Sequence, residues 1–384
     1  MNKPPKPIPL FVLTGFLGAG KTSLLNRLLH EPAMAGTLVI INEFGDIGLD
    51  HLFIDVKDDA TIMLSSGCLC CTVRGELVST LEDVLRDLDN KRMPAFERVV
   101  IETTGLADPA PVLQSVLGHP YLSRRFHLQG VITLVDAVNG LATLDAHEEA
   151  LKQAAIADVL VISKSDLCEN DPAGLNALRE RLAALNPFAR HLDSAKGEAT
   201  ASTLMDLDGF ALTGKDRRVA DWLAQDDHTT HKHDHAHHHD HHHGHAEGHA
   251  HGHAHHHDKN RHNDHIKAFA LTSDEAIRAS VLEMFLDLLR SAHGPKLLRV
   301  KGLVRIAEDP SRPLLLHGVQ HVFHPPQRLP QWPDDDHRTR LVFITKDLDA
   351  AFVERLWSAL TGTPQIDQAD RQALADNPLS LRNS

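Results

Sequence analysis

The chain has 384 residues, a formal net charge of −13 at pH 7 and 30 histidines, with 42% hydrophobic and 24% charged residues. The hydrophobic and charged fractions are ordinary for a globular protein with a sizeable core, the length favours two or more domains, and the histidine count is the one unusual value. The acidic balance and the lack of a basic tract with interleaved aromatic residues exclude a nucleic-acid-binding surface.

Hydropathy and cysteine usage narrow the class further. No stretch approaches the roughly 18 to 20 apolar residues of a membrane span, so we expect no membrane association. The apolar residues 8–13 are too few for a signal peptide and are followed by no small-residue cleavage site. Three of the four cysteines lie between positions 68 and 71, which rules out a disulfide framework. We therefore expect a cytoplasmic protein with reduced thiols.

Short apolar runs alternate with amphipathic segments from residue 8 to about residue 187. This alternation predicts βαβ units and an α/β fold with a mostly parallel sheet. Predicted strands span residues 8–13, 38–42, 61–64, 98–102, 130–136 and 159–164, and helical periodicity marks residues 23–29, 77–89 and 109–117. In such sheets ligands bind at the carboxyl ends of the strands.

Residues 15–22 read GFLGAGKT, a full match to G-x-x-x-x-G-K-[ST] between a predicted strand and a predicted helix. This context predicts a P-loop in which backbone N–H groups cradle the phosphates. Lys21 then reaches the β- and γ-oxygens, and Thr22 ligates Mg²⁺. The predicted nucleotide contacts in this segment are Gly15, Leu17, Gly18, Ala19, Gly20, Lys21, Thr22 and Ser23. The alternative is a glycine-rich turn without a ligand.

Two acidic segments follow later strands. Glu43 and Asp46 lie in NEFGD (residues 42–46), which we interpret as a switch segment ordered by Mg²⁺ and the γ-phosphate. Glu102 ends the strand RVVIE before TTG, where it can hold the Mg²⁺ shell or orient a water molecule. We assign Lys21, Glu102 and Glu43 as catalytic residues. The alternative for Glu43 and Asp46 is a polar surface turn.

The sequence GCLCC places Cys68, Cys70 and Cys71 directly after the predicted strand at 61–64. Three thiolates within four residues suit Zn²⁺ or another thiophilic ion and leave a fourth ligand position open. Buried structural cysteines are the alternative. Redox catalysis is less favoured, because the spacing is not C-x-x-C.

The apolar run at 159–162 ends in Ser163-Lys164-Ser165-Asp166. A carboxylate at Asp166 can accept both the N1–H and the exocyclic amine of guanine, while the Lys164 stem packs over the base. GTPases usually have Asn where this chain has Ser163, and this change removes a side-chain amide from guanine recognition. The alternative is a solvated strand-end Lys and Asp.

The composition changes abruptly after residue 226. Between His228 and His265 lie 19 of the 30 histidines, and nothing there can bury a core, so we predict a disordered linker over 227–265. Clustered imidazoles bind Zn²⁺, Ni²⁺ or Co²⁺ weakly, which favours a metal-concentrating role over a plain spacer. We expect a P-loop GTPase domain over 1–226 and a smaller α+β domain over 266–384, with strands at 266–272, 297–306, 314–320 and 340–345 and helices at 274–292 and 349–360.

GFLGAGKT, NEFGD, GCLCC, ETTGLADP, SKSD and a C-terminal RVKG together resemble the CobW-type metallochaperone GTPases over nearly the whole chain apart from the linker. The resemblance implies a GTPase that binds Zn²⁺ or Co²⁺ and transfers it to a client metalloprotein. It implies that Cys68, Cys70 and Cys71 are the ligands of the transferred metal, with Glu43 or Asp46 completing the shell. Ile41 departs from some relatives, which carry an acid there, so the shell rests more heavily on the thiolates.

We therefore expect a GTP hydrolase with Mg²⁺ whose nucleotide state controls a thiolate metal site. A metal buffer with incidental hydrolysis, a nickel-insertion GTPase and an ATP-dependent enzyme are the alternatives. The client and the oligomeric state, a homo-oligomer included, are not fixed by the sequence.

Overall fold

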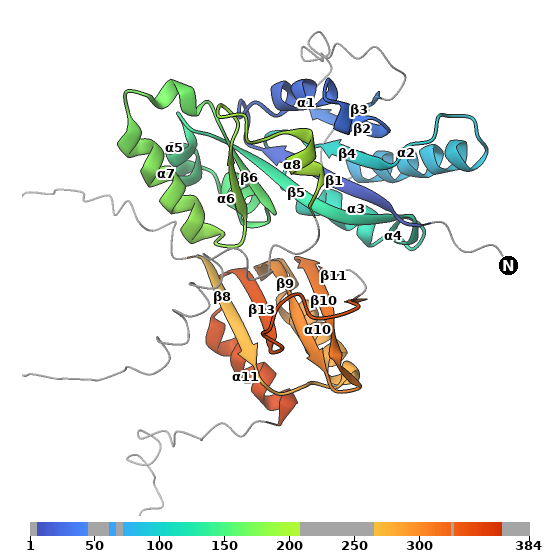
Figure 1. Ribbon diagram of the computed structural model, residues 1–384, viewed down its shortest axis with the longest axis vertical. Helices are drawn as coiled ribbons and strands as arrows, with labels where there is room; N and C mark the ends of the chain where they lie inside the picture. Colours follow the sequence, from blue (N-terminus) through green and yellow to red (C-terminus); the bar gives the residue numbers. More distant parts are fainter. Residues whose placement is uncertain (1–5, 45–60, 67–71, 208–264, 324–325, 363–384) are drawn as a thin grey trace, which may run out of the picture.

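Two sheets form the framework of the molecule, one in each half of the chain (Figure 1). The computed structural model describes residues 6–44, 61–66, 72–207, 265–323 and 326–362. The N-terminal half is a P-loop domain with helices around a parallel sheet, and the C-terminal half is an α+β domain with an antiparallel sheet. This confirms the predicted fold class.

The P-loop domain is built on a seven-stranded sheet in the order β3-β2-β4-β1-β5-β6-β7. Every neighbouring pair in it is parallel. The strands are β1 (Ile8–Gly15), β2 (Thr37–Phe44), β3 (Thr61–Ser66), β4 (Arg98–Glu102), β5 (Phe126–Asp136), β6 (Val159–Ser163) and β7 (Arg190–Asp193). Because all strands run the same way, the segments that follow β1, β2, β3, β4 and β6 leave the sheet at one edge.

The central strands are buried on both faces, which explains their unbroken apolar sequences. In β1, Leu10 and Val12 join the core of one face, and Phe11 and Leu13 join the core of the other. Helices α1 (Lys21–Leu29) and α8 (Ala201–Met205) cover the Phe11 face.

The opposite face carries the remaining helices of the P-loop domain. These are α2 (Thr72–Asp89), α3 (Ala110–Leu117), α4 (Leu122–Arg125), α5 (Gly140–Ala146), α6 (Glu148–Ala155) and α7 (Pro172–Leu185), with a short 3-10 turn at Ser165–Cys168. A second 3-10 turn, Pro32–Met34, lies on the Phe11 face. Proline at the first position starts α7, and the Asp171 carboxylate caps that helix by accepting the Gly174 N–H.

The C-terminal domain is a six-stranded sheet in the order β11-β10-β9-β13-β8, with β12 paired to β10. Its strands are β8 (Ile266–Ser273), β9 (Leu297–Ile306), β10 (Asp309–Val319), β11 (Val322–Phe323), β12 (Gln327–Arg328) and β13 (Thr339–Lys346). Helices α10 (Ala279–His293) and α11 (Ala350–Thr361) pack on one face, and a 3-10 turn spans Gly294–Lys296. From the other face, Leu298, Val319 and Ile344 join the core of the P-loop domain.

Strand β7 and helix α10 are among the elements that differ from the sequence prediction. The short edge strand β7 was not predicted, because its sequence RHLD lacks an apolar run. Helix α10 begins at Ala279 rather than at residue 274, because the backbone of Ile277 pairs with Ile306 in a β-bridge. The predicted linker lies outside the described residues apart from His265, and the predicted boundary at 226 also falls outside them.

Candidate functional site

The P-loop turns between β1 and α1, where the sequence predicted it. Gly15, Gly18 and Gly20 all have positive φ, of 141°, 75° and 91°. At Gly15 a Cβ atom would also lie 2.5 Å from the Leu134 carbonyl oxygen, so glycine is required there twice over. The loop therefore makes a tight turn that leads directly into the N-terminus of α1.

The Lys21 side chain is buried and folds back over this loop. Its Nζ donates to the carbonyl oxygens of Gly15 at 2.9 Å and Phe16 at 3.3 Å. Ala19 is buried beneath the loop, whereas Leu17 and Ser23 are exposed at its mouth. The ammonium group is thereby held where a phosphate chain on the loop would meet it.

Thr22, in the first turn of α1, meets Glu102 at the end of β4. The Thr22 hydroxyl donates to Glu102 Oε1 at 2.9 Å, and the Glu102 side chain is only 4% exposed. Glu102 is in register with Leu13 of β1 and with Ile41 of β2, so it stands at the carboxyl edge between the two strands. A hydroxyl and a carboxylate side by side form a hard oxygen donor pair.

The turn after β4 packs directly on the P-loop. Thr103 donates its N–H to the Leu13 carbonyl and its hydroxyl to Thr14 Oγ1 at 2.8 Å. Gly105 lies so close to Leu17 that a Cβ atom at Gly105 would come within 2.6 Å of the Leu17 N and Cα atoms. The segment ETTG and the P-loop thus form one packed unit.

The β6 end is tied to the same loop from the other side. Lys164 has a left-handed φ of 58°, and its Nζ donates to the Gly18 carbonyl at 2.8 Å and to Asp136 Oδ2 at 2.7 Å. The Ser163 hydroxyl donates to the Ala19 carbonyl at 2.7 Å. The hydroxyl that replaces the usual amide therefore anchors the P-loop to β6. Asp166 is exposed at the start of the turn that follows.

Asp136, at the end of β5, belongs to this group and was missed by the sequence analysis. Burial raises the pKa of Asp136, but hydrogen bonds from Lys164 and from the Val138 N–H outweigh it, so its pKa lies below the ordinary value. Asp136 therefore stays ionised and fixes the Lys164 ammonium. Its position as an acid at a strand end in this sheet was the available signal.

The predicted metal site falls largely outside the described residues. This holds for Cys68, Cys70, Cys71 and Asp46. The backbone of Glu43 lies in β2, in register with Ser65 of β3, and β3 ends one residue later. Among the residues that the structure describes, no three His, Cys, Asp or Glu side chains gather as metal ligands would. None of the helices in this described part of the chain combines the length and the hydropathy of a membrane span.

Both domains of this architecture match families of known proteins. Residues 9–193 match the family model "CobW/HypB/UreG, nucleotide-binding domain", and residues 266–361 match "Cobalamin synthesis protein cobW C-terminal domain". The chain is 31% identical to the zinc chaperone YjiA of Escherichia coli, over 88% of this chain and 94% of that protein. It is 30% identical to the zinc chaperone CobW of Pseudomonas aeruginosa, over 92% of each.

A solved structure agrees. The crystal structure of Zn(II)-bound YjiA GTPase from E. coli superimposes with a TM-score of 0.63 at 28% identity, covering 93% of this chain and 99% of that one. Similarity in both halves of the chain, over nearly full length, leaves one assignment. The protein belongs to the CobW family of P-loop GTPases.

Proposed function

We propose that this protein is a metallochaperone that hydrolyses GTP, binds Zn²⁺ through Cys68, Cys70 and Cys71, and transfers the ion to a client metalloprotein under control of its nucleotide state. The observation that carries the proposal is the contact between Thr22 of the P-loop and Glu102 of β4, on the strand that separates the P-loop from β2 and β3.

The residues around the P-loop fit Mg·GTP. Thr22 and Glu102 form a partly buried hydroxyl and carboxylate pair at the N-terminus of α1, and hard oxygen donors of this kind suit Mg²⁺. When bound, the ion neutralises charge on the phosphate oxygens. Lys21, now on the carbonyls of Gly15 and Phe16, has an ammonium that moves to the β- and γ-oxygens. Glu102 would either orient the attacking water molecule or hold the Mg²⁺ shell.

Guanine selection falls to the β6 end. Lys164 and Ser163 both bind backbone carbonyls of the P-loop, which gives the base-binding loop and the phosphate-binding loop a fixed relation. The Asp166 carboxylate is exposed and free to accept the N1–H and exocyclic amine of guanine.

The strand order supports control of the metal by the nucleotide. In the strand order β3-β2-β4-β1, the three cysteines follow β3 in the sequence and the P-loop follows β1. Three strand spacings of about 4.8 Å put these two ends about 14 Å apart. The two strands between them are β2, which contains Glu43 and precedes Asp46 in the sequence, and β4, which carries Glu102. We propose that the γ-phosphate acts on the cysteine ligands through the residues that follow β2.

Zinc as cargo follows from the thiolates and from the named zinc chaperones among the relatives. Co²⁺ would use the same ligands, and the histidine-rich residues 227–265 would raise the local concentration of either ion.

Two measurements test this function. Turnover of GTP and ATP is compared for the wild-type protein and for Lys21→Ala, and we expect GTP hydrolysis that Lys21→Ala abolishes. An anaerobic Zn²⁺ titration then compares wild type with a variant in which Cys68, Cys70 and Cys71 are all serine. Cys168→Ser is the matched control, because Cys168 is buried in the core beside α7. Preference for ATP, or tight Zn²⁺ binding by the triple variant, would exclude the proposed chemistry.

A metal buffer in which hydrolysis is incidental is the rival function. It predicts that Lys21→Ala leaves cellular zinc handling unchanged, whereas a nucleotide-controlled chaperone loses it. A nickel-insertion GTPase predicts that the cysteine site prefers Ni²⁺ to Zn²⁺.

A further inference from the structure

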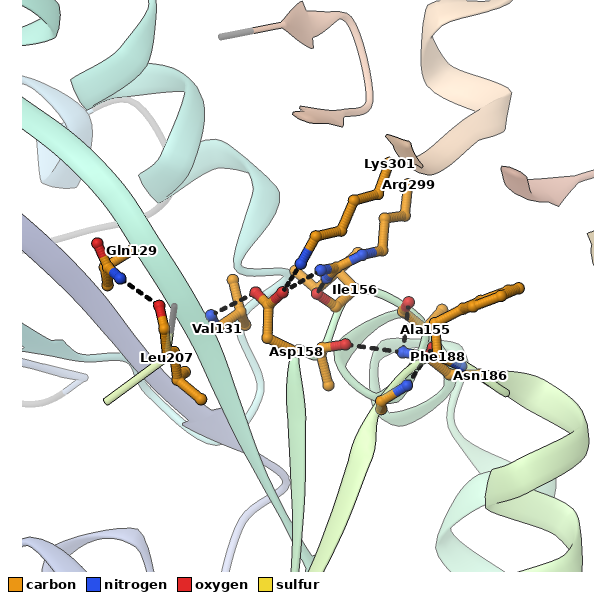
Figure 2. Close-up of polar contacts among 12 residues, drawn as sticks. Gln129, Val131, Ala155, Ile156, Asp158, Asn186, Phe188, Leu207, Arg299 and Lys301 are labelled. Atoms are coloured by element: carbon orange, nitrogen blue, oxygen red, sulfur yellow. Dashed lines mark hydrogen bonds and ion pairs between the residues drawn. The ribbon is translucent and has the colours of Figure 1, made fainter. Parts of the chain in front are cut away.

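A buried cluster of charges joins the two domains at the edge of the sheet opposite the nucleotide site. Asp158 directly precedes β6 and is 7% exposed, and it accepts hydrogen bonds from Lys301 Nζ at 3.0 Å and from the Val131 N–H at 2.9 Å (Figure 2). Arg299 donates to the same carboxylate and also to the carbonyl oxygen of Ile156. Both cations belong to β9 of the C-terminal domain.

The strand period explains why both cations reach Asp158. Residues 299 and 301 lie two apart in β9, so they project from the same face of the sheet. Val300, between them, packs into the helix-covered core of the opposite face. Buried ion pairs contribute little net stability compared with apolar packing but restrict orientation, because an unpaired buried charge is costly. The cluster therefore fixes how the C-terminal domain sits on the end of α6.

A second contact holds the other end of α6. Lys346 of β13 donates to Glu148 at 2.6 Å, and Glu148 also pairs with Lys152 at 2.9 Å. Hydrogen bonds from Lys346 and then Lys152 lower the pKa of Glu148 to about 2. Lys152 continues to Asp108 at 3.6 Å, in the turn that follows ETTG. The C-terminal domain thus contacts α6 at both ends.

Between these two contacts with the C-terminal domain, the Gln153 side chain of α6 points toward the turn that follows β4. Its side chain is 1% exposed, and its Nε2 donates to the carbonyl oxygens of Gly105 at 3.2 Å and Ala107 at 2.9 Å. The Gln153 carbonyl accepts the Thr133 hydroxyl at 2.8 Å, which fixes the helix at this point on β5. The turn that Gln153 holds is the one that packs against Leu17 and follows Glu102.

We propose that Gln153 is a positioning residue for GTP hydrolysis, and that the C-terminal domain sets its position through α6. Arg299 and Lys301 fix the C-terminal end of the helix, and Lys346 fixes its N-terminal end. Gln153 lies between them, and its hydrogen bonds hold residues 105–107 against the P-loop. The C-terminal domain, beyond any contact with a client, is then required for full turnover. This inference rests on the proposed hydrolysis of GTP.

The first test removes the two Gln153 hydrogen bonds with little change in volume. We expect Gln153→Met to lower kcat about tenfold while KM for GTP stays within about twofold, because a small displacement of the turn affects the reacting geometry more than nucleotide binding. A kcat within twofold of wild type overturns the proposal. If the wild-type protein itself hydrolyses no GTP, the proposed function fails instead, so the two failures are distinguishable.

The second test asks whether the C-terminal domain acts through the same residue. Lys346 and Glu148 have side chains 28% and 49% exposed, so Lys346→Met leaves the fold intact even if a core variant does not. We expect Lys346→Met to lower kcat about threefold, and to add nothing in the Gln153→Met background, because both changes release the same turn. Multiplicative effects on kcat would overturn transmission through α6.

A matched control uses another contact between the domains. Gln114 of α3 donates to Gln320 at 2.7 Å, and this hydrogen bond involves no residue of α6. We expect Gln320→Ala to leave kcat and KM unchanged. A loss equal to that of Lys346→Met would mean that any weakening of the domain interface slows turnover, and would overturn the specific role of α6.

Discussion

The closest approach between the ETTG turn and the P-loop gives a sharp mutational prediction. In Gly105→Ala, the new Cβ atom would lie 2.6 Å from the Leu17 N and Cα atoms, whereas ordinary contact begins at 3.4 Å. The φ of Gly105 lies outside the left-handed region, so alanine brings no backbone strain and the effect is purely steric. Turn and loop must therefore separate by about 0.8 Å. A misplacement near 1 Å can cost about a hundredfold in rate, so we expect kcat/KM for GTP to fall between about ten- and a hundredfold.

The assay is steady-state phosphate release at varied GTP, with thermal unfolding measured alongside. Gly75→Ala is the control, because a Cβ at this exposed position of α2 meets nothing within 4 Å. Alanine there should raise stability by about 0.5–1 kcal/mol and leave the kinetics unchanged. A Gly105→Ala protein that keeps kcat/KM within threefold of wild type would refute the packing of this turn on the P-loop.

Three further predictions concern the other contacts. Ser163→Ala removes the hydrogen bond to the Ala19 carbonyl, and a loss of about 1 kcal/mol should weaken nucleotide binding about fivefold by calorimetry; unchanged affinity would contradict this. Asp158→Ala leaves two buried cations unpaired and should cost about 3–5 kcal/mol in urea unfolding, whereas a loss under 1 kcal/mol would show the cluster to be solvated. The depressed pKa of Glu148 means that its pair with Lys346 stabilises the fold above about pH 4.5 and is lost as the pH falls toward 2. Because Glu148 is half exposed, we expect at most about 1 kcal/mol, measured as the pH dependence of wild-type minus Glu148→Gln stability, and a flat difference would contradict it.

The fold was predictable where burial leaves a regular pattern. Each central strand is an apolar run, and β4 and β9 have the predicted bounds because polar or turn residues flank them. Strand β5 begins at Phe126, whereas the sequence predicted a start at residue 130. The prediction began too late because His127 and Gln129 interrupt the apolar pattern at the start of the strand. The edge strand β7 has no such pattern at all, since only Leu192 and Asp193 in it are buried.

The nucleotide motifs were readable because backbone conformation demands glycine and phosphate chemistry demands lysine and threonine at fixed spacing. The contacts that join these motifs could not be predicted from the sequence. Ser163 reaches the Ala19 carbonyl across 144 positions of sequence, and Gln153 reaches Gly105 across 48, so both depend on the folded arrangement of strands. Asp158 carries no local signal, because its two cationic partners, Arg299 and Lys301, belong to a separate domain.

The most direct measurement is the Zn²⁺ dissociation constant of the intact protein, determined anaerobically with a non-hydrolysable GTP analogue and again with GDP. Coupling of about 1–3 kcal/mol between two sites corresponds to a five- to 150-fold difference, and we expect the two constants to differ within that range. Changing Cys68, Cys70 and Cys71 to serine should abolish the difference, and Cys168→Ser should preserve it. Equal Zn²⁺ affinities in the two nucleotide states would contradict control of the metal by GTP.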